Sequence, residues 1–145
     1  MFKINITANS LQAKDSEDIS FPEAIQSIYD YSAKIYLNWN DIDVPISLKM
    51  DISDSWNDLL KMIECLGGEF DEYKMEWPSQ SFFAVWDIKK INDTEIIIAP
   101  HWSDKPNTDL TVNKNLFITE WENVVSSVRN DLKMQGYLPD ELLNR

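Results

Sequence analysis

One histidine in the chain, His101, has a side chain suited to acid–base chemistry near neutral pH. It lies in the stretch "IIIAPHWSD" at 96–104, where a strand-forming pattern ends. Nucleophilic catalysis would require a second reactive group within hydrogen-bonding distance of the imidazole. The one thiol, Cys65, is expected inside a helix between the core residues Ile63 and Leu66. We therefore expect His101 to end a strand, and the sequence predicts no catalytic residue.

Metal and cofactor sites also find little support in the residue types present. Zinc sites use several Cys and His side chains at close spacing, whereas this chain has one of each. The segment "DISDSWND" at 51–58 offers three aspartates, but an EF-hand loop would have glycine where Trp56 stands. Neither a glycine-rich phosphate-binding loop nor a G-x-S-x-G motif is present. The sequence therefore predicts neither a metal nor a cofactor.

Acidic residues dominate the charge of the chain. It has 25 Asp and Glu residues against 13 Lys and Arg, which gives a formal net charge of −12. Such a surface repels nucleic acid and anionic membranes and attracts basic proteins. The acids concentrate between residues 51 and 76. From this segment we predict the following partner-binding residues: Asp51, Asp54, Asp58, Glu69, Asp71, Glu72 and Glu76.

The length, the N-terminal sequence and the cysteine content predict one cytoplasmic domain spanning residues 1–145. The chain is of single-domain length, and no Pro/Gly/Ser-rich linker divides it. The N-terminal residues lack the apolar run of a secretory signal, and no run reaches the roughly 18 residues that span a bilayer. One cysteine cannot form an internal disulfide, which is typical of a reducing cytosol.

Hydrophobic periodicity and turn residues predict an α+β fold with the order β-α-β-β-α-β-β-β-α and a mostly antiparallel sheet. We expect strands at 3–7, 34–39, 45–52, 70–77, 81–90 and 94–102. About three helices should pack on the sheet. The first follows a capping box of Ser20 and Glu23, the second begins near 53–55 and ends at Gly67–Gly68, and the third runs from a capping box of Thr119 and Glu122 to Gly136.

Alternation along the expected strands assigns faces to their side chains. On the strand at 70–77, Tyr73, Met75 and Trp77 share one face. Glu72, Lys74 and Glu76 share the other face, toward solvent. The apolar stripe of the last helix consists of Ile118, Trp121, Val125, Val128 and Leu132. The six tryptophans are spread over several elements, and we expect them to form core rather than line a cleft.

Three stretches of the chain, "INITANS…DSEDISFPEAI", "SWNDLLKMIECL" and "NLFITEWENVV", resemble small acidic immunity proteins. These proteins belong to bacterial contact-dependent growth inhibition and related polymorphic toxin systems. The resemblance covers most of the chain and rests on fold-forming residues. It implies a cytoplasmic protein that binds the C-terminal toxin domain of a cognate effector, often a nuclease, and blocks it. No binding residue follows from it.

The expected function is therefore stoichiometric inhibition of a basic nuclease toxin by a protein that is not an enzyme, without direct contact to nucleic acid or membrane. Two alternatives remain open. A hydrolase could use a pair of carboxylates, since 25 acidic residues contain pairs at suitable separations in some fold. An acidic adaptor or a mimic of nucleic acid would instead bind several basic proteins with similar affinity.

Overall fold

The computed structural model describes residues 1–79 and 81–145. Over these residues it forms two antiparallel sheets and three α-helices, so the predicted α+β class and element order are confirmed. The strands are β1 (Ile4–Thr7), β2 (Lys34–Trp39), β3 (Ile42–Ser47), β4 (Glu72–Ser79), β5 (Phe82–Lys90), β6 (Glu95–Trp102) and β7 (Leu110–Asn113). The α-helices are α1 (Phe21–Ile28), α2 (Trp56–Gly67) and α3 (Lys114–Met134). A π-helical turn, η1 (Leu48–Ile52), and a 3₁₀ turn, η2 (Pro139–Glu141), complete the fold.

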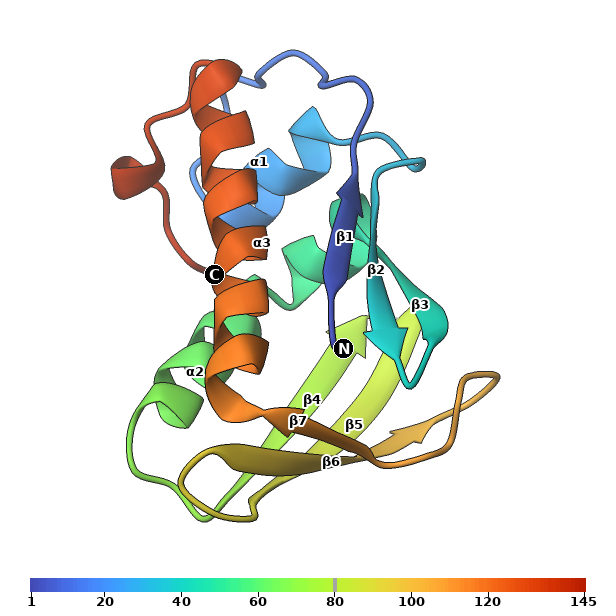
Figure 1. The fold of residues 1–145 in the computed structure, drawn as a ribbon. Coiled ribbons are helices and arrows are strands. Elements are labelled where there is room, and N and C mark those ends of the chain that lie inside the picture. The colour runs from blue at the N-terminus through green and yellow to red at the C-terminus, as the bar shows by residue number, and fades with distance from the viewer. Residues whose placement is uncertain (80) are drawn as a thin grey trace.

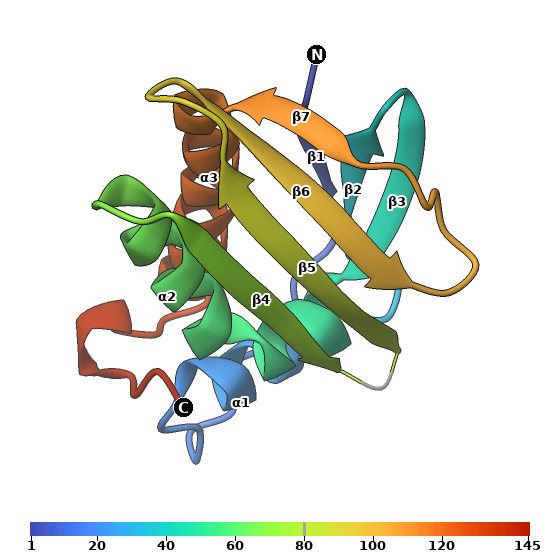
Figure 2. The same cartoon turned by 90° about the horizontal axis from the view of Figure 1, so that it is seen from below.

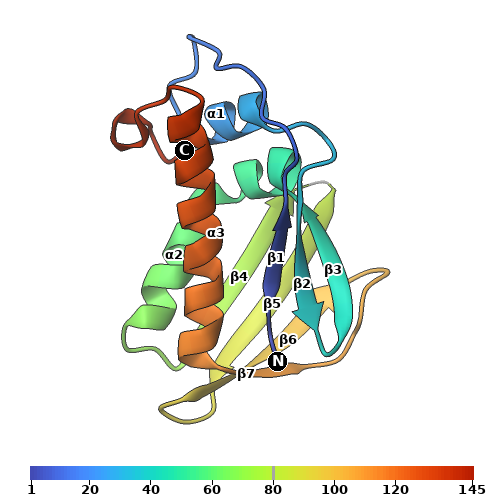
Figure 3. The same ribbon diagram turned by 45° about the horizontal axis from the view of Figure 1, so that its top comes forward.

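The two sheets lie on different sides of the core. Strands β1-β2-β3 form the smaller sheet and β4-β5-β6-β7 the larger one. The larger sheet lies below α2, α3 and the smaller sheet (Figure 1). Seen from below, its other face has no element in front of it (Figure 2). Helix α3 lies between α2 and β1 and contacts both (Figure 3). One face of the four-stranded sheet is therefore covered, and the other is open to solvent.

Local turn chemistry explains the hairpin of β2 and β3. Trp39 pairs with Ile42, which leaves the two-residue turn Asn40-Asp41. Both turn residues have positive φ, 51° and 69°. Asn and Asp adopt this left-handed conformation more readily than most residues, and a two-residue turn with positive φ at both positions matches the twist of the flanking strands. The strands predicted at 34–39 and 45–52 do form this hairpin, but β3 begins at Ile42, so the turn is shorter than the predicted connection over 40–44.

The predicted strand at 45–52 is wrong in its second half, because the chain turns at Ser47. The Ser47 hydroxyl accepts a hydrogen bond from the Met50 backbone N–H at 3.1 Å, which starts the π-helical turn η1. Leu48 and Ile52 are still buried. The alternation of apolar residues was therefore a correct indication of burial but not of strand geometry.

The helices differ in how well their starts were predicted. The capping box of Ser20 and Glu23 is present at the N-terminus of α1. Helix α3 instead begins at Lys114, where the Asn113 side chain accepts the Leu116 N–H at 2.9 Å. The predicted capping box of Thr119 and Glu122 is wrong, since both residues lie inside α3. Strand β7, which was not predicted, leads directly into this cap.

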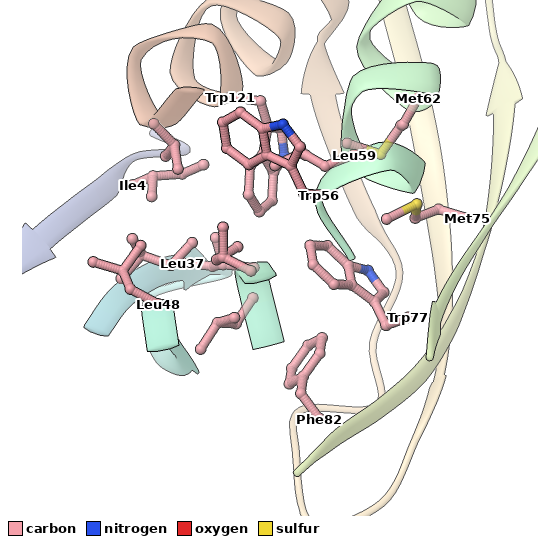
Figure 4. Packing of buried hydrophobic residues seen from close by; sticks show 14 of the residues in the cluster. Ile4, Leu37, Leu48, Trp56, Leu59, Met62, Met75, Trp77, Phe82 and Trp121 are labelled. Atoms are coloured by element: carbon pink, nitrogen blue, oxygen red, sulfur yellow. The ribbon is translucent and has the colours of Figure 1, made fainter. Parts of the chain in front are cut away.

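Tryptophan rings fill the space between the sheets and the helices. Five of the six are almost completely buried, namely Trp39, Trp56, Trp77, Trp86 and Trp121, and Trp102 is half-buried. Trp77 lies 5.1 Å from Trp86 and 5.6 Å from Trp121 between ring centroids. Figure 4 shows Trp56, Trp77 and Trp121 converging with Leu59, Met62 and Met75. The prediction that the tryptophans form core is confirmed for these five, whereas Trp102 also lines a pocket at the surface.

A buried carboxylate ties the first strand to the last helix. Glu120 is 6% exposed, and its Oε1 accepts the backbone N–H of Ile4 at 2.8 Å. The Lys3 ammonium lies 4.0 Å from the same oxygen. Glu120 thus supplies a hydrogen-bond acceptor to the first residue of β1. The apolar stripe predicted for α3 did not include this polar position.

Candidate partner-binding surface

Asp51 does not belong to a partner-binding surface, because the fold buries it. It is 3% exposed, and its Oδ2 accepts the Ser47 backbone N–H at 2.8 Å. Its Oδ1 accepts the hydroxyl of Ser81. Asp51 therefore joins η1 to the chain just before β5. Its inclusion among the predicted partner-binding residues was wrong, because those hydrogen bonds depend on tertiary contacts that its acidic neighbours in the sequence do not indicate.

We expect Asp51→Ala to lower the free energy of unfolding by about 1–3 kcal/mol, because it leaves a buried backbone N–H and a hydroxyl without their acceptor. Urea unfolding followed by circular dichroism measures the change. The matched control is Asp54→Ala, an exposed aspartate three residues along, which should change stability by no more than about 0.5 kcal/mol. Equal losses in the two variants would contradict a structural role for Asp51.

Asp54 and Asp58 lie at the start of α2. Asp54 is exposed and precedes the helix, while Asp58 is half-buried in its first turn. Partial burial raises the pKa of the Asp54 carboxyl, and the neighbouring Asp51 raises it further. Their i, i+4 spacing would bring like charges together if both lay within one helix. The structure places Asp54 outside α2, and a carboxylate in the first turn is favourable to the helix dipole.

Tyr73 marks where α2 meets the edge strand β4. Burial raises the pKa of the Tyr73 hydroxyl, and the nearby Cys65 and Asp58 raise it further. On the inner side of the sheet, Met62 and Leu59 of α2 converge with Met75 of β4 (Figure 4). Helix α2 therefore presents Asp58 beside the edge of β4.

Glu69 and Asp71 lie in the exposed loop that joins α2 to β4. Glu72 and Glu76 follow on β4, where they are exposed, while Met75 and Trp77 are buried and Tyr73 is half-buried. The predicted division of this strand into two faces is confirmed. Five of the seven acids are thus exposed and Asp58 is half-buried, and these six occupy two surfaces separated by the edge of β4.

We define the outer face as the side of the four-stranded sheet that faces the viewer in Figure 2. Its residues alternate with the buried ones along each strand, and they are Glu72, Lys74, Glu76 and Pro78 of β4, Phe83, Val85, Asp87 and Lys89 of β5, Glu95, Ile97, Ala99 and His101 of β6, and Thr111 and Asn113 of β7.

Charges on the outer face are matched across the strands. Glu72 pairs with Lys89 in the β4–β5 register, with Oε1 3.9 Å from Nζ, and Lys74 pairs with Asp87. Opposite charges in such cross-strand positions stabilise a sheet by a few tenths of a kcal/mol. Glu76 stands opposite Val85 and forms no ion pair with any residue that the structure describes. Its carboxylate is therefore available to a partner.

His101 lies on the outer face at the end of β6, as its position in the sequence predicted. Its imidazole is exposed, and Nε2 lies 2.8 Å from Oδ2 of Asp87. The sequence did not indicate this contact, which depends on the pairing of β5 with β6. Cys65 lies in α2, on the other side of the sheet. The four-stranded sheet therefore separates the only imidazole from the only thiol.

Among the pockets that the described residues form on the outer face, two are prominent. One, of about 490 Å³, is lined by Glu72, Lys74, Asp87, Lys89, Ile97, Ala99 and Asp109. The other, of about 510 Å³, is lined by Ser81, Phe83, His101, Trp102, Ser103, Asp104, Lys105 and Asn107. In the first pocket, Lys74 and Lys89 lie among the carboxylates, so cations of the protein itself partly balance the negative charge there. Across residues 1–79 and 81–145 no cluster of three or more His, Cys, Asp or Glu could hold a metal ion.

Comparisons with known proteins identify no relative of this chain. No family model, no curated protein and no solved structure matches the chain. None of the described helices combines the length and the apolar character that a membrane span requires.

Proposed function

We propose that this protein binds and neutralises a basic protein by stoichiometric association, as an immunity protein does with the toxin domain of its cognate effector. The expected partner is a bacterial nuclease domain, met in the cytoplasm. A nuclease that grips phosphate has a cationic site, and clustered carboxylates complement such a site. The proposal also draws on the resemblance of three stretches of the chain to acidic immunity proteins.

The observation that supports the proposal best is the arrangement of carboxylates on both sides of β4. Asp58 lies on α2, and Glu72 and Glu76 lie on β4 itself, so regular elements hold these acids. The chain as a whole has a net charge of −12. Fixed carboxylates on such a background steer a basic protein toward this surface and keep their positions when it binds.

The test is to express the protein together with the toxin domain encoded by the neighbouring reading frame. We expect restored growth of the host cells, and a 1:1 stoichiometry when the purified proteins are titrated by calorimetry. An unrelated basic protein, such as lysozyme, is the control and should bind at least about 100-fold more weakly. Similar affinity for both would contradict specific inhibition and would favour an acidic adaptor.

A further inference from the structure

We propose that the outer face is the surface that contacts the basic partner, with the Phe83 side chain as its main apolar anchor. This inference rests on the proposed function and adds the location of the contact to it. It places the direct contact on the outer face, while the acids of α2, on the other side of the β4 edge, add to the long-range attraction of a basic partner.

Phe83 stands out because it is a large aromatic side chain exposed on an inner strand. It is 70% exposed on β5, whereas Phe82 beside it is buried in the core. Pro78 lies opposite Phe83 in the β4–β5 register, and Val85 follows on the same face. Exposed rings on a rigid sheet need little ordering on binding, and aromatic side chains dominate the energetic centres of protein interfaces.

The surroundings of Phe83 have the composition of an interface. Val85, Ile97 and Ala99 are half-buried on the same face and continue the apolar surface away from Phe83. Charged side chains flank this strip on β4, at Asp87 and Lys89 of β5 and at Glu95 of β6. An apolar centre with a polar rim is typical of surfaces that bind another protein.

The shape of the outer face suits a partner that inserts side chains into it. Phe83 forms one wall of the 510 Å³ pocket, and Asp104 forms part of its rim. Asp87 lines the 490 Å³ pocket and His101 lines the 510 Å³ pocket, so the contact between these two side chains joins the two regions. Phe83 can thus insert into an apolar recess of the partner, and a side chain of the partner can insert into the pocket beside Phe83.

Charge indicates the nature of the partner. Four carboxylates of the outer face, Glu72, Glu76, Asp87 and Glu95, stand against two lysines, Lys74 and Lys89. Near Phe83, Glu76 has no ion pair within the described residues, and the pocket beside Phe83 holds one carboxylate, Asp104, and one ammonium, Lys105. A surface with Lys or Arg side chains around an apolar recess complements this pattern. A second copy of the chain would bring the same excess of negative charge, which disfavours self-association.

The decisive experiment measures the affinity of the Phe83→Ala variant for the toxin domain of the neighbouring reading frame by calorimetry. We expect Kd to rise by at least about 30-fold, the loss typical of an aromatic hot spot. The matched control is Tyr31→Ala, because Tyr31 is 71% exposed and lies between α1 and β2, outside the four-stranded sheet. This control should bind within about 2-fold of the wild type.

A second measurement keeps the inference testable without substitution. Hydroxyl-radical footprinting of the wild-type complex should show protection of the Phe83 ring and none of Tyr31. Wild-type binding with no effect of Phe83→Ala would overturn the location of the contact and leave the proposed function standing. Absence of binding by the wild type would contradict both. A wild-type dimer that Phe83→Ala dissociates, seen by sedimentation, would identify a second copy as the occupant and would also overturn the inference.

Discussion

Trp121→Ala is expected to lower the free energy of unfolding by about 3–5 kcal/mol, a large share of the 5–15 kcal/mol typical of a domain. The Trp121 ring is fully buried in α3, with ring centroids of Trp77 at 5.6 Å and Phe117 at 6.4 Å. Alanine would leave a cavity between α3 and the four-stranded sheet. Urea unfolding followed by far-UV circular dichroism measures the loss.

Trp121→Phe is the matched variant for this prediction. The indole N–H of Trp121 is buried and has no hydrogen-bond partner among the described residues. Phenylalanine therefore removes part of the ring without breaking a hydrogen bond, and it should cost clearly less than alanine. Thermal unfolding of Trp121→Ala that matches the wild type would mean that the ring is not packed in the core.

Elements defined by local chemistry were the ones that the sequence predicted well. The capping box of Ser20 and Glu23 involves residues three positions apart, and both partners are visible in the sequence. The existence of the β2–β3 hairpin was also predictable, although its turn uses Asn40 and Asp41 alone and not the whole of 40–44. The start of α3 was harder to predict from the sequence. Its N-cap, Asn113, is also the last residue of the four-residue strand β7, where it pairs with Glu95 of β6.

For the candidate surface, too, features of a single element were predictable and contacts between distant residues were not. Exposure of Glu72 and Glu76 followed from alternation along one strand. Burial of Asp51 could not be derived in this way, because the hydroxyl of Ser81, thirty positions along the chain, closes over it. The contact between His101 and Asp87 required the β5–β6 register, which alternation leaves undetermined. Charge placement within an element was predictable, and charge pairing between elements was not.

Reversal of Asp54, Asp58, Glu72 and Glu76 to Lys is expected to slow association with the basic toxin domain by about 10-fold or more. The matched control reverses four exposed acids elsewhere, Glu17, Asp43, Glu122 and Glu141. Both variants change the net charge by the same eight units, so any difference between them reports where the charges lie. Association rates against immobilised toxin domain measure the effect, with circular dichroism to establish that both variants fold.

Salt provides an independent test of the same mechanism. Raising ionic strength from about 50 to 500 mM shortens the Debye length from roughly 14 Å to about 4 Å, which screens charges that steer the partner from a distance. The wild-type association rate should therefore fall as salt rises, and the rate of the four-Lys variant should fall much less. Dissociation should respond weakly to salt, because apolar contacts around Phe83 are not screened. A salt-independent association rate together with full binding by the four-Lys variant would refute electrostatic recognition of the toxin by these acids.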